Sequence, residues 1–421
     1  MTLQRFAPAA LAVACLAVCA GAQAQDSGFR FSGFGTVGLA HTNSHDVEFL
    51  TPGQPGDGAT STGFDFSPDT KLGVQTDYKI NQMLSATAQV LSKENGKGNW
   101  NPSPEWLFVK AQLTPAVSAR VGRMGTPFFM ISDFRDVNYA NLWVRPPLEV
   151  YGQVPITNFN GADLTYKTDI GDTTLTGTVF GGPSRSYYET SKVKLNDQFG
   201  FNATAELGGD LTFRLGYARS KLTFASSLTP QVSAAYAGLA PYASLVGLSA
   251  SDLTYFANQL AADDARSSFL GFGATWDVRN WTFSGEFTKR RTDSYIPNTT
   301  GWYASAGYRF GKFTPFVYAS EVKVDHQPSN PIPTNRTYGG LTTSFLTASA
   351  YGTAVLNKAN VAQKALAAGV RWDAFKNVAV KGQFEMIKPD SNTGLMYAAT
   401  PTANVRDKTI NVLSLSVDFV F

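Results

Sequence analysis

Cysteine is nearly absent from this chain of 421 residues, and its two examples, Cys15 and Cys19, both lie near the start. They fall in a segment with a single early charge, Arg5, followed by an apolar run and a small-x-small cleavage pattern. Such a segment is typical of a secretory signal peptide, so we expect residues 1–24 to be removed and residues 25–421 to form one domain. The mature chain would then contain no cysteine, which excludes disulfides, thiolate metal sites and cysteine nucleophiles.

Long apolar runs are also absent after that first segment, because no stretch approaches the roughly 20 apolar residues that a membrane helix needs. A chain can still cross a bilayer as a closed β-barrel, whose strands need an apolar residue only at every second position. Charged residues make up only 16% of the chain, whereas it contains 38 Gly, 30 Phe and 17 Tyr. The 35 basic and 32 acidic residues nearly balance, so charge gives no argument for a nucleic-acid partner.

The last residues of the chain alternate between apolar and polar. Apolar residues from Leu413 to Phe419 are separated by serines and an aspartate, and the sequence ends at Phe421. A period of two is that of a β-strand with two different faces. An ordinary half-buried strand that comes last would show the same alternation. A terminal aromatic residue that closes such a strand also resembles the C-terminal signal that the assembly machinery of outer-membrane β-barrels reads.

About sixteen segments of the mature chain alternate in this way, and the gaps between them alternate in length. Tight turns such as Gly208-Gly209-Asp210 are followed by long connections, among them residues 124–157, 225–265 and 325–363. Membrane barrels have this asymmetry, with short periplasmic turns and long extracellular loops. We therefore predict an all-β fold, a transmembrane antiparallel β-barrel of about sixteen strands with both chain ends at the rim of the short turns. A barrel of about eighteen strands is the alternative for a chain of this length.

Two of the long connections contain helical spacing of apolar residues. Residues 252–260 place Leu253, Phe256 and Leu260 on one face, and residues 346–362 show a weaker form of the same pattern. We expect short loop helices that either pack over the outer mouth or bind a partner.

Charged residues recur on the strand faces opposite the apolar ones. Because a charge facing lipid is unfavourable, an aqueous lumen explains them, and about sixteen strands leave a lumen too wide for side chains to fill. The predicted wall residues are Lys110, Arg214, Glu286, Arg290, Arg309, Arg371, Asp373, Lys381 and Glu385.

The connection 124–157 follows a strand that ends in Gly122-Arg123, and Pro127 comes soon after. Here the chain resembles the general diffusion porins of Gram-negative bacteria, in which a Gly-Arg step leads into a third loop folded inside the barrel. The resemblance implies a water-filled channel for passive diffusion of small hydrophilic solutes and ions, and a homotrimer. It also implies a constriction formed by the third loop and the wall, with the loop acids opposite Arg120 or Arg123. The predicted constriction residues are Arg120, Arg123, Asp133, Arg135, Asp136, Arg145 and Glu149.

This loop departs from the family pattern because it lacks a run of acids. Its acidic residues Asp133, Asp136 and Glu149 are interleaved with Arg135 and Arg145. The wall carries slightly more basic than acidic candidates, and salt at about 0.15 M screens exposed charges beyond roughly 8 Å. We therefore expect a mild preference for anions or small carboxylate-bearing solutes.

Other functions have less support in the sequence. We find no nucleophile and base that suggest an enzyme, and no cofactor is indicated. His41 and His45 have helical i,i+4 spacing, but no helix is suggested there, so we do not expect a metal site. A substrate-specific barrel of eighteen strands is one alternative function. A closed structural or adhesive barrel that binds surfaces through residues 225–265 and 325–363 is another.

Overall fold

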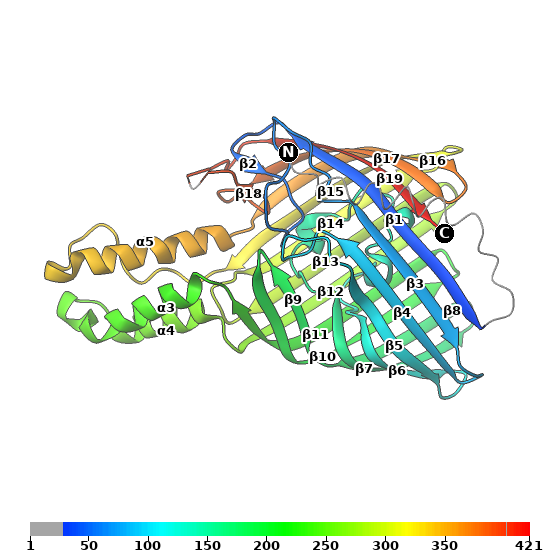
Figure 1. Ribbon diagram of the computed structural model, residues 1–421, viewed down its shortest axis with the longest axis horizontal. Helices are drawn as coiled ribbons and strands as arrows, with labels where there is room; N and C mark the ends of the chain where they lie inside the picture. Colours follow the sequence, from blue (N-terminus) through cyan, green and yellow to red (C-terminus); the bar gives the residue numbers. More distant parts are fainter. Residues whose placement is uncertain (1–27, 401) are drawn as a thin grey trace.

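A computed structural model describes residues 28–400 and 402–421 and shows a β-barrel (Figure 1). The predicted signal peptide, residues 1–24, lies outside the described residues. Within the described residues sixteen strands follow one another around the barrel. They are β1 (Phe29–Thr42), β3 (Lys71–Lys79), β4 (Leu84–Lys93), β5 (Ser103–Gln112), β6 (Val117–Gly125), β7 (Asn158–Ile170), β8 (Thr173–Gly181), β10 (Ser191–Leu207), β11 (Leu211–Ala225), β12 (Ala265–Val278), β13 (Trp281–Thr292), β14 (Asn298–Tyr308), β15 (Phe313–His326), β16 (Gln363–Phe375), β17 (Val378–Pro389) and β19 (Ile410–Val420).

Every strand pairs with its neighbours in antiparallel fashion, and β1 closes the circle by pairing with both β3 and β19. A short strand, β9 (Ser184–Tyr188), continues β8 along the outer part of β10. Two further short strands, β2 (Val47–Glu48) and β18 (Tyr397–Ala398), pair with each other apart from the main sheet. The prediction of an antiparallel barrel of sixteen strands is confirmed, and the eighteen-stranded alternative is wrong.

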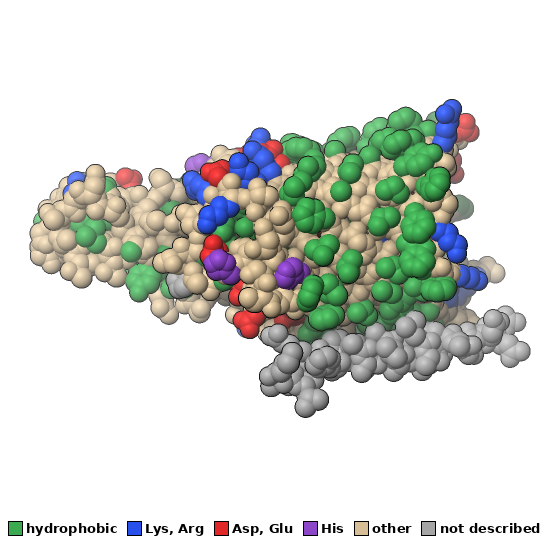
Figure 2. Space-filling model, turned by 90° about the horizontal axis from the view of Figure 1, so that it is seen from above, with side chains coloured by type: hydrophobic (Ala, Val, Ile, Leu, Met, Phe, Trp, Pro, Cys, Tyr) green, Lys and Arg blue, Asp and Glu red, His purple; other side chains and the backbone are tan. Residues whose placement is uncertain are grey.

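The alternation of the sequence separates the two faces of the wall. In β19 the side chains of Leu413, Leu415 and Val417 are exposed, whereas Ser414 and Ser416 are buried inside the barrel. The outward apolar side chains gather over part of the barrel, and charged side chains flank this region (Figure 2). Such a band is what the hydrocarbon of a membrane requires of a barrel. None of the helices among the described residues combines the length and apolarity needed to cross a membrane.

The two predicted loop helices form as α4 (Ala250–Ala261) and α5 (Thr342–Ala359), and they pack with a third helix that was not predicted, α3 (Thr229–Leu239). All three extend beyond the barrel at the end opposite the C-terminus (Figure 1). Ser249 caps α4 by accepting a hydrogen bond from the backbone N–H of Asp252. Leu253 and Phe256 are buried in the cluster that joins the three helices, together with Phe345 of α5. The short helices η4 (Ala240–Val246) and η5 (Gly339–Leu341) connect them to the loops.

The C-terminal residue completes the seam between the first and last strands. The backbone N–H of Gly33 donates to the C-terminal carboxylate of Phe421 at 2.9 Å, and the N–H of Phe421 donates to the carbonyl of Gly33 at 3.0 Å. The Phe421 ring lies so close to the Gly33 Cα that a side chain at position 33 would overlap it. It also stacks on Phe419, with ring centroids 6.4 Å apart. The terminal ring therefore covers the end of the β1–β19 pairing.

We expect Phe421→Ala to weaken this seam, because the ring loses its contacts with Gly33 and Phe419. Full burial makes a Phe→Ala change cost about 3–5 kcal/mol, and the partly exposed Phe421 should lose a smaller part of that stability. Thermal unfolding of the detergent-solubilised barrel measures the loss. The matched control is Phe375→Ala, since Phe375 is also a rim aromatic but is 73% exposed. Equal unfolding temperatures for the two variants would contradict a sealing role for Phe421.

Candidate functional site

The connection between β6 and β7 folds into the barrel, as the sequence predicts. It contains η2 (Ser132–Phe134), η3 (Asn138–Ala140) and α2 (Leu148–Tyr151), and we call residues 126–157 the third loop. Phe128 packs on Phe269 of β12, with ring centroids 5.4 Å apart. Its carbonyl lies against Gly271, where an added Cβ would come within 2.7 Å of the oxygen. Apolar contacts with the inner wall therefore hold the beginning of the loop.

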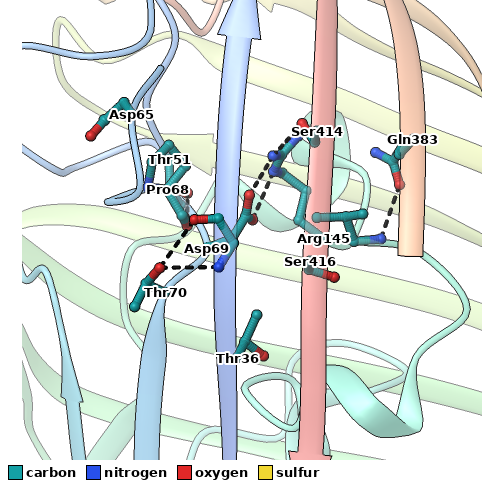
Figure 3. Close-up of polar contacts among 12 residues, drawn as sticks. Thr36, Thr51, Asp65, Pro68, Asp69, Thr70, Arg145, Gln383, Ser414 and Ser416 are labelled. Atoms are coloured by element: carbon teal, nitrogen blue, oxygen red, sulfur yellow. Dashed lines mark hydrogen bonds and ion pairs between the residues drawn. The ribbon is translucent and has the colours of Figure 1, made fainter. Parts of the chain in front are cut away.

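Arg145 attaches the middle of the third loop to the wall. Its guanidinium donates to both oxygens of Asp69, at 2.9 and 2.5 Å, and to Glu385 of β17 at 2.7 Å. It also donates to the hydroxyl of Ser414 at 2.7 Å, between β1 and β19 in Figure 3. The ring of Phe49 covers the guanidinium carbon at 4.7 Å. Burial by itself would lower the pKa of Arg145, but the two carboxylates outweigh it and raise that pKa. Arg145 is only 4% exposed, so it fastens the loop and does not line an open passage.

Two basic wall residues hold the backbone of the same loop. Lys381 Nζ donates to the carbonyls of Asn138 and Trp143 at 2.6 and 2.9 Å and pairs with Asp418 at 2.9 Å. On the neighbouring strand, Arg371 donates to two further loop carbonyls at 2.6 and 3.1 Å. Arg371 also pairs with Asp373 at 2.8 Å, so these predicted wall residues face inward. Buried carbonyls need partners, and these cations supply them.

Two buried carboxylates complete the attachment. Glu149 accepts hydrogen bonds from Ser320 at 2.8 Å and from Gln363 at 2.6 Å. Burial raises the pKa of Glu149 above its ordinary value, although these hydrogen bonds oppose the rise. Glu286 of β13 accepts from the backbone N–H of Met130 at 2.9 Å and from two tyrosine hydroxyls, those of Tyr151 and Tyr303. Glu149 was predicted at the constriction, but both carboxylates serve as buried acceptors.

The other two loop acids face basic residues of the wall. Asp136 pairs with Lys93 of β4 at 2.8 Å and with Lys71 of β3 at 3.5 Å. Burial by itself would raise the pKa of Asp136, but the two lysines outweigh it and hold that pKa well below its usual range. Asp133 is 62% exposed at its side chain and pairs with Arg214 of β11 at 2.9 Å. Acids of the loop therefore do lie opposite bases of the wall.

The bases that they meet are not the predicted ones. Arg120 pairs instead with Asp163 of the adjacent β7 at 2.5 Å. Arg123 comes three residues after Arg120, so alternation turns it to the outer face with Val121, which is 64% exposed. Its guanidinium donates to Asn160 at 3.1 Å and to the Pro104 carbonyl at 2.8 Å. The prediction that Arg123 faces the lumen is wrong.

The structure places the remaining three predicted residues, Arg135, Arg309 and Lys110, in three different environments. Arg135 donates to the carbonyl of Tyr151 at 2.9 Å and thus closes the loop on itself. Arg309 lies after the end of β14, exposed at the rim of the short turns, so its placement on the wall is wrong. Lys110 of β5 lies in register with Arg120 on the inner face.

Among the described residues no cluster of His, Asp and Glu could hold a metal ion.

Comparisons with known proteins identify the class of this barrel. The family model described as Gram-negative porin matches residues 9–327. The chain belongs to the Gram-negative porin family. Porins are channels, so this porin is a passive diffusion channel of the outer membrane. No curated protein matches the chain.

Solved structures with the same fold have little sequence in common with this porin. It is similar to OmpF of Salmonella typhi in complex with daunomycin, with 13% identity, a TM-score of 0.53 and coverage of 94% of this chain and 99% of that one. An anion-selective porin from Comamonas acidovorans has 12% identity and a TM-score of 0.52, with coverage of 93% and 99%. The trimer form of OmpT from Vibrio cholerae has 12% identity and a TM-score of 0.50, also with 93% and 99% coverage.

Sequence reasoning missed most of the partners of the third loop in this porin, among them Asp69, Lys71 and Lys93. One signal was present, because Lys71 and Lys93 lie directly opposite each other on β3 and β4. Two like charges directly opposite each other destabilise a strand pair. An anion that pairs with both lysines compensates for this repulsion. That anion is Asp136, supplied by the loop.

Removing Arg145 should detach the middle of the loop. Arg145→Ala leaves Asp69 and Glu385 buried without their cation, and breaking a buried ion pair in this way costs about 3–5 kcal/mol. We expect a lower unfolding temperature and larger, noisier single-channel currents in planar bilayers. Arg135→Ala is the control, because that arginine contacts only its own loop. If both variants behaved alike, the anchoring role of Arg145 would be wrong.

Glu149 predicts a pH effect of defined sign. Since its pKa is raised in the folded state, its contribution to stability is complete below pH 4.5 and is lost as the pH rises through the raised pKa. The pKa of Asp136 is lowered, so its contribution to stability is lost as the pH falls, but only below about pH 3.8. Glu149→Gln should therefore be at least as stable as the wild type at pH 7 and show a weaker fall in unfolding temperature between about pH 4 and 8. The exposed Asp252→Asn is the control. A variant less stable than the wild type at pH 7 would show that the carboxylate is bound as an anion.

Proposed function

We propose that small hydrophilic solutes and ions pass between the third loop and the inner wall formed by β5, β6 and β7. The observation that carries this proposal is the one-sided attachment of the loop. Most of its polar contacts lie on β3, β4, β11, the strands from β13 to β17, and β19. Two others lie near its exit, where Pro155 accepts from Ser186 of β9 and Thr157 contacts Glu105 of β5. On the opposite wall, the Arg120 side chain remains 30% exposed, and Lys110 beside it is half-buried.

Among the accessible charges of this wall, bases outnumber acids. Lys110, Arg120 and Lys167 lie on the inner faces of three adjacent strands and keep contact with solvent. Of the acids on the same faces, Asp163 and Glu105 are buried, and Asp169 is exposed. The charges are solvated, so salt screens them at distances beyond roughly 8 Å under physiological conditions. The proposal is therefore a wide, weakly selective channel with a mild preference for anions. Catalysis has no part in it.

Reversal potentials across a salt gradient test this assignment. The wild type should prefer anions slightly near 10 mM salt, where screening extends over about 30 Å, and lose the preference near 1 M. The double variant Lys110→Gln, Lys167→Gln should abolish it. The control is Lys289→Gln, because Lys289 shares the outer face of β13 with the exposed Phe287. A strong cation preference would place the passage along the loop acids Asp133 and Asp136 instead, and a wild type that conducts no ions would favour a closed structural barrel.

We also propose a homotrimer. The support is the trimer form described for OmpT of Vibrio cholerae, which shares this fold at a TM-score of 0.50. The particle mass of the detergent-solubilised porin distinguishes a trimer from a monomer.

We also propose that the terminal residue, Phe421, is recognised by the outer-membrane assembly machinery. Phe421 ends the last strand beside the barrel seam, where the assembly machinery could read it before β1 pairs with β19. Phe421→Ala should then reduce the amount of folded porin in the outer membrane more strongly than it slows refolding in detergent. Equal losses in both settings would indicate a purely structural role.

A further inference from the structure

Three basic side chains lie together on the barrel wall, near the end that carries the long loops. Arg219 of β11 and Arg291 of β13 both lie opposite Ser268 of β12 in the strand register. Adjacent strands are about 4.8 Å apart, so roughly 10 Å separates the backbones of the two arginines, with a small serine between them. Lys289 lies two residues before Arg291, about 7 Å further along β13. We call Arg219, Lys289 and Arg291 the outer basic patch.

The outer basic patch points away from the lumen. Tyr217 is 38% exposed, and strand alternation gives Arg219 the same face of β11. Phe287 is 43% exposed and shares its face of β13 with Lys289 and Arg291. Both arginines are exposed, and the lysine is half-buried. The patch therefore faces the surroundings of the barrel and lies outside the passage proposed above.

The three cations of the patch have no acidic partner among the described residues. Lysines on the outer surface of other strands near the same rim do have one. Lys323 lies 3.3 Å and Lys364 lies 3.6 Å from Glu321, and Lys388 lies 3.7 Å from Asp407. The contrast shows that acidic partners are available on this rim but are not placed at the patch.

Acids close to the patch in sequence are paired with other bases. Asp293 comes two residues after Arg291, but it lies 3.8 Å from Arg266. Asp197 pairs with Lys221 at 2.8 Å. Like charges on neighbouring strands of one face destabilise a sheet, so the patch favours an anion supplied from outside the chain.

An apolar row lies beside the patch, toward the short turns. Leu215, Phe272 and Phe287 face one another across the same three strands and are between 39% and 47% exposed. Outward apolar side chains of a membrane barrel contact hydrocarbon. This row is four residues from the two arginines, or about 13 Å along the strands. An anion bound by the patch would thus lie at the edge of the hydrocarbon, where lipid headgroups are found.

We propose that the outer basic patch binds the phosphate of a membrane lipid. Guanidinium groups bind phosphate through two parallel hydrogen bonds, and the lysine adds a point charge. The acyl chains of the same lipid lie against the apolar row. Long loops of membrane barrels are extracellular, so this lipid belongs to the outer leaflet. A free phosphate ion fits less well, because it gains none of the apolar contact, which is favoured by about 25 cal/mol for each Å² removed from water.

Titration of the detergent-solubilised porin with phosphatidic acid, followed by native mass spectrometry, tests the site. Diacylglycerol with the same acyl chains lacks the phosphate and should bind about tenfold more weakly or worse. Inorganic phosphate should not displace the lipid. These two comparisons use the wild type, so they do not depend on the folding of any variant.

A pair of triple variants assigns the binding to the patch. The variant Arg219→Gln, Lys289→Gln, Arg291→Gln should weaken the binding of phosphatidic acid about tenfold or more. The matched control is Lys323→Gln, Lys364→Gln, Lys388→Gln, which also removes three outer cations but only ones that have acidic partners. The control should bind phosphatidic acid as the wild type does.

Equal losses in the two triple variants would overturn the proposal, because general charge attraction would then explain the binding. So would diacylglycerol binding as tightly as phosphatidic acid, or displacement of the lipid by inorganic phosphate. Currents in planar bilayers separate the patch from the passage. The patch variant should conduct as the wild type does, and a changed reversal potential would mean that these residues act on the solutes and not on a lipid.

Discussion

The backbone hydrogen bonds of every strand must be completed inside the protein, because hydrocarbon offers them no partner. This constraint governs the rest of the structure. It makes β1 pair with both β3 and β19, so that the barrel wall formed by the described residues is closed, and it brings Phe421 next to Gly33 at the seam. Closure with sixteen strands then leaves an interior too wide for wall side chains to fill. The third loop occupies part of that space.

A loop inside a barrel carries backbone groups away from bulk water, and those groups need partners. Here charged side chains supply many of them, since Lys381 and Arg371 donate to loop carbonyls and Glu286 accepts from a loop N–H. Some of these charges are in turn paired with an opposite charge, as Arg145 is with Asp69 and Glu385. The predicted wall charges thus turn out to act largely as attachments for the loop. Arg120 of β6 is not one of these attachments, because it pairs with Asp163 of β7.

The attachment of the loop divides the lumen into two unlike parts. On one side, polar and basic side chains remain in contact with solvent, which suits hydrated ions. On the other, the loop exit, the upper strands and α5 enclose an apolar cavity, and Arg290 lies in its wall without an acidic partner. A single inserted loop therefore separates a polar part of the lumen from an apolar cavity.

The sequence alone determined the barrel, because a period of two and alternating loop lengths are local properties. The alternation of the strands correctly predicted that Lys381, Glu385 and Arg371 face inward. The helical spacing of apolar residues correctly predicted the position of α4. Alternation would also have excluded Arg123, since residues three apart lie on opposite faces of a strand. Tertiary structure alone decided which charges meet. Arg145 and Glu385 are 240 positions apart, and their pairing depends on the path of the loop through the lumen. No local pattern encodes that path, because it results from the sum of many long-range contacts.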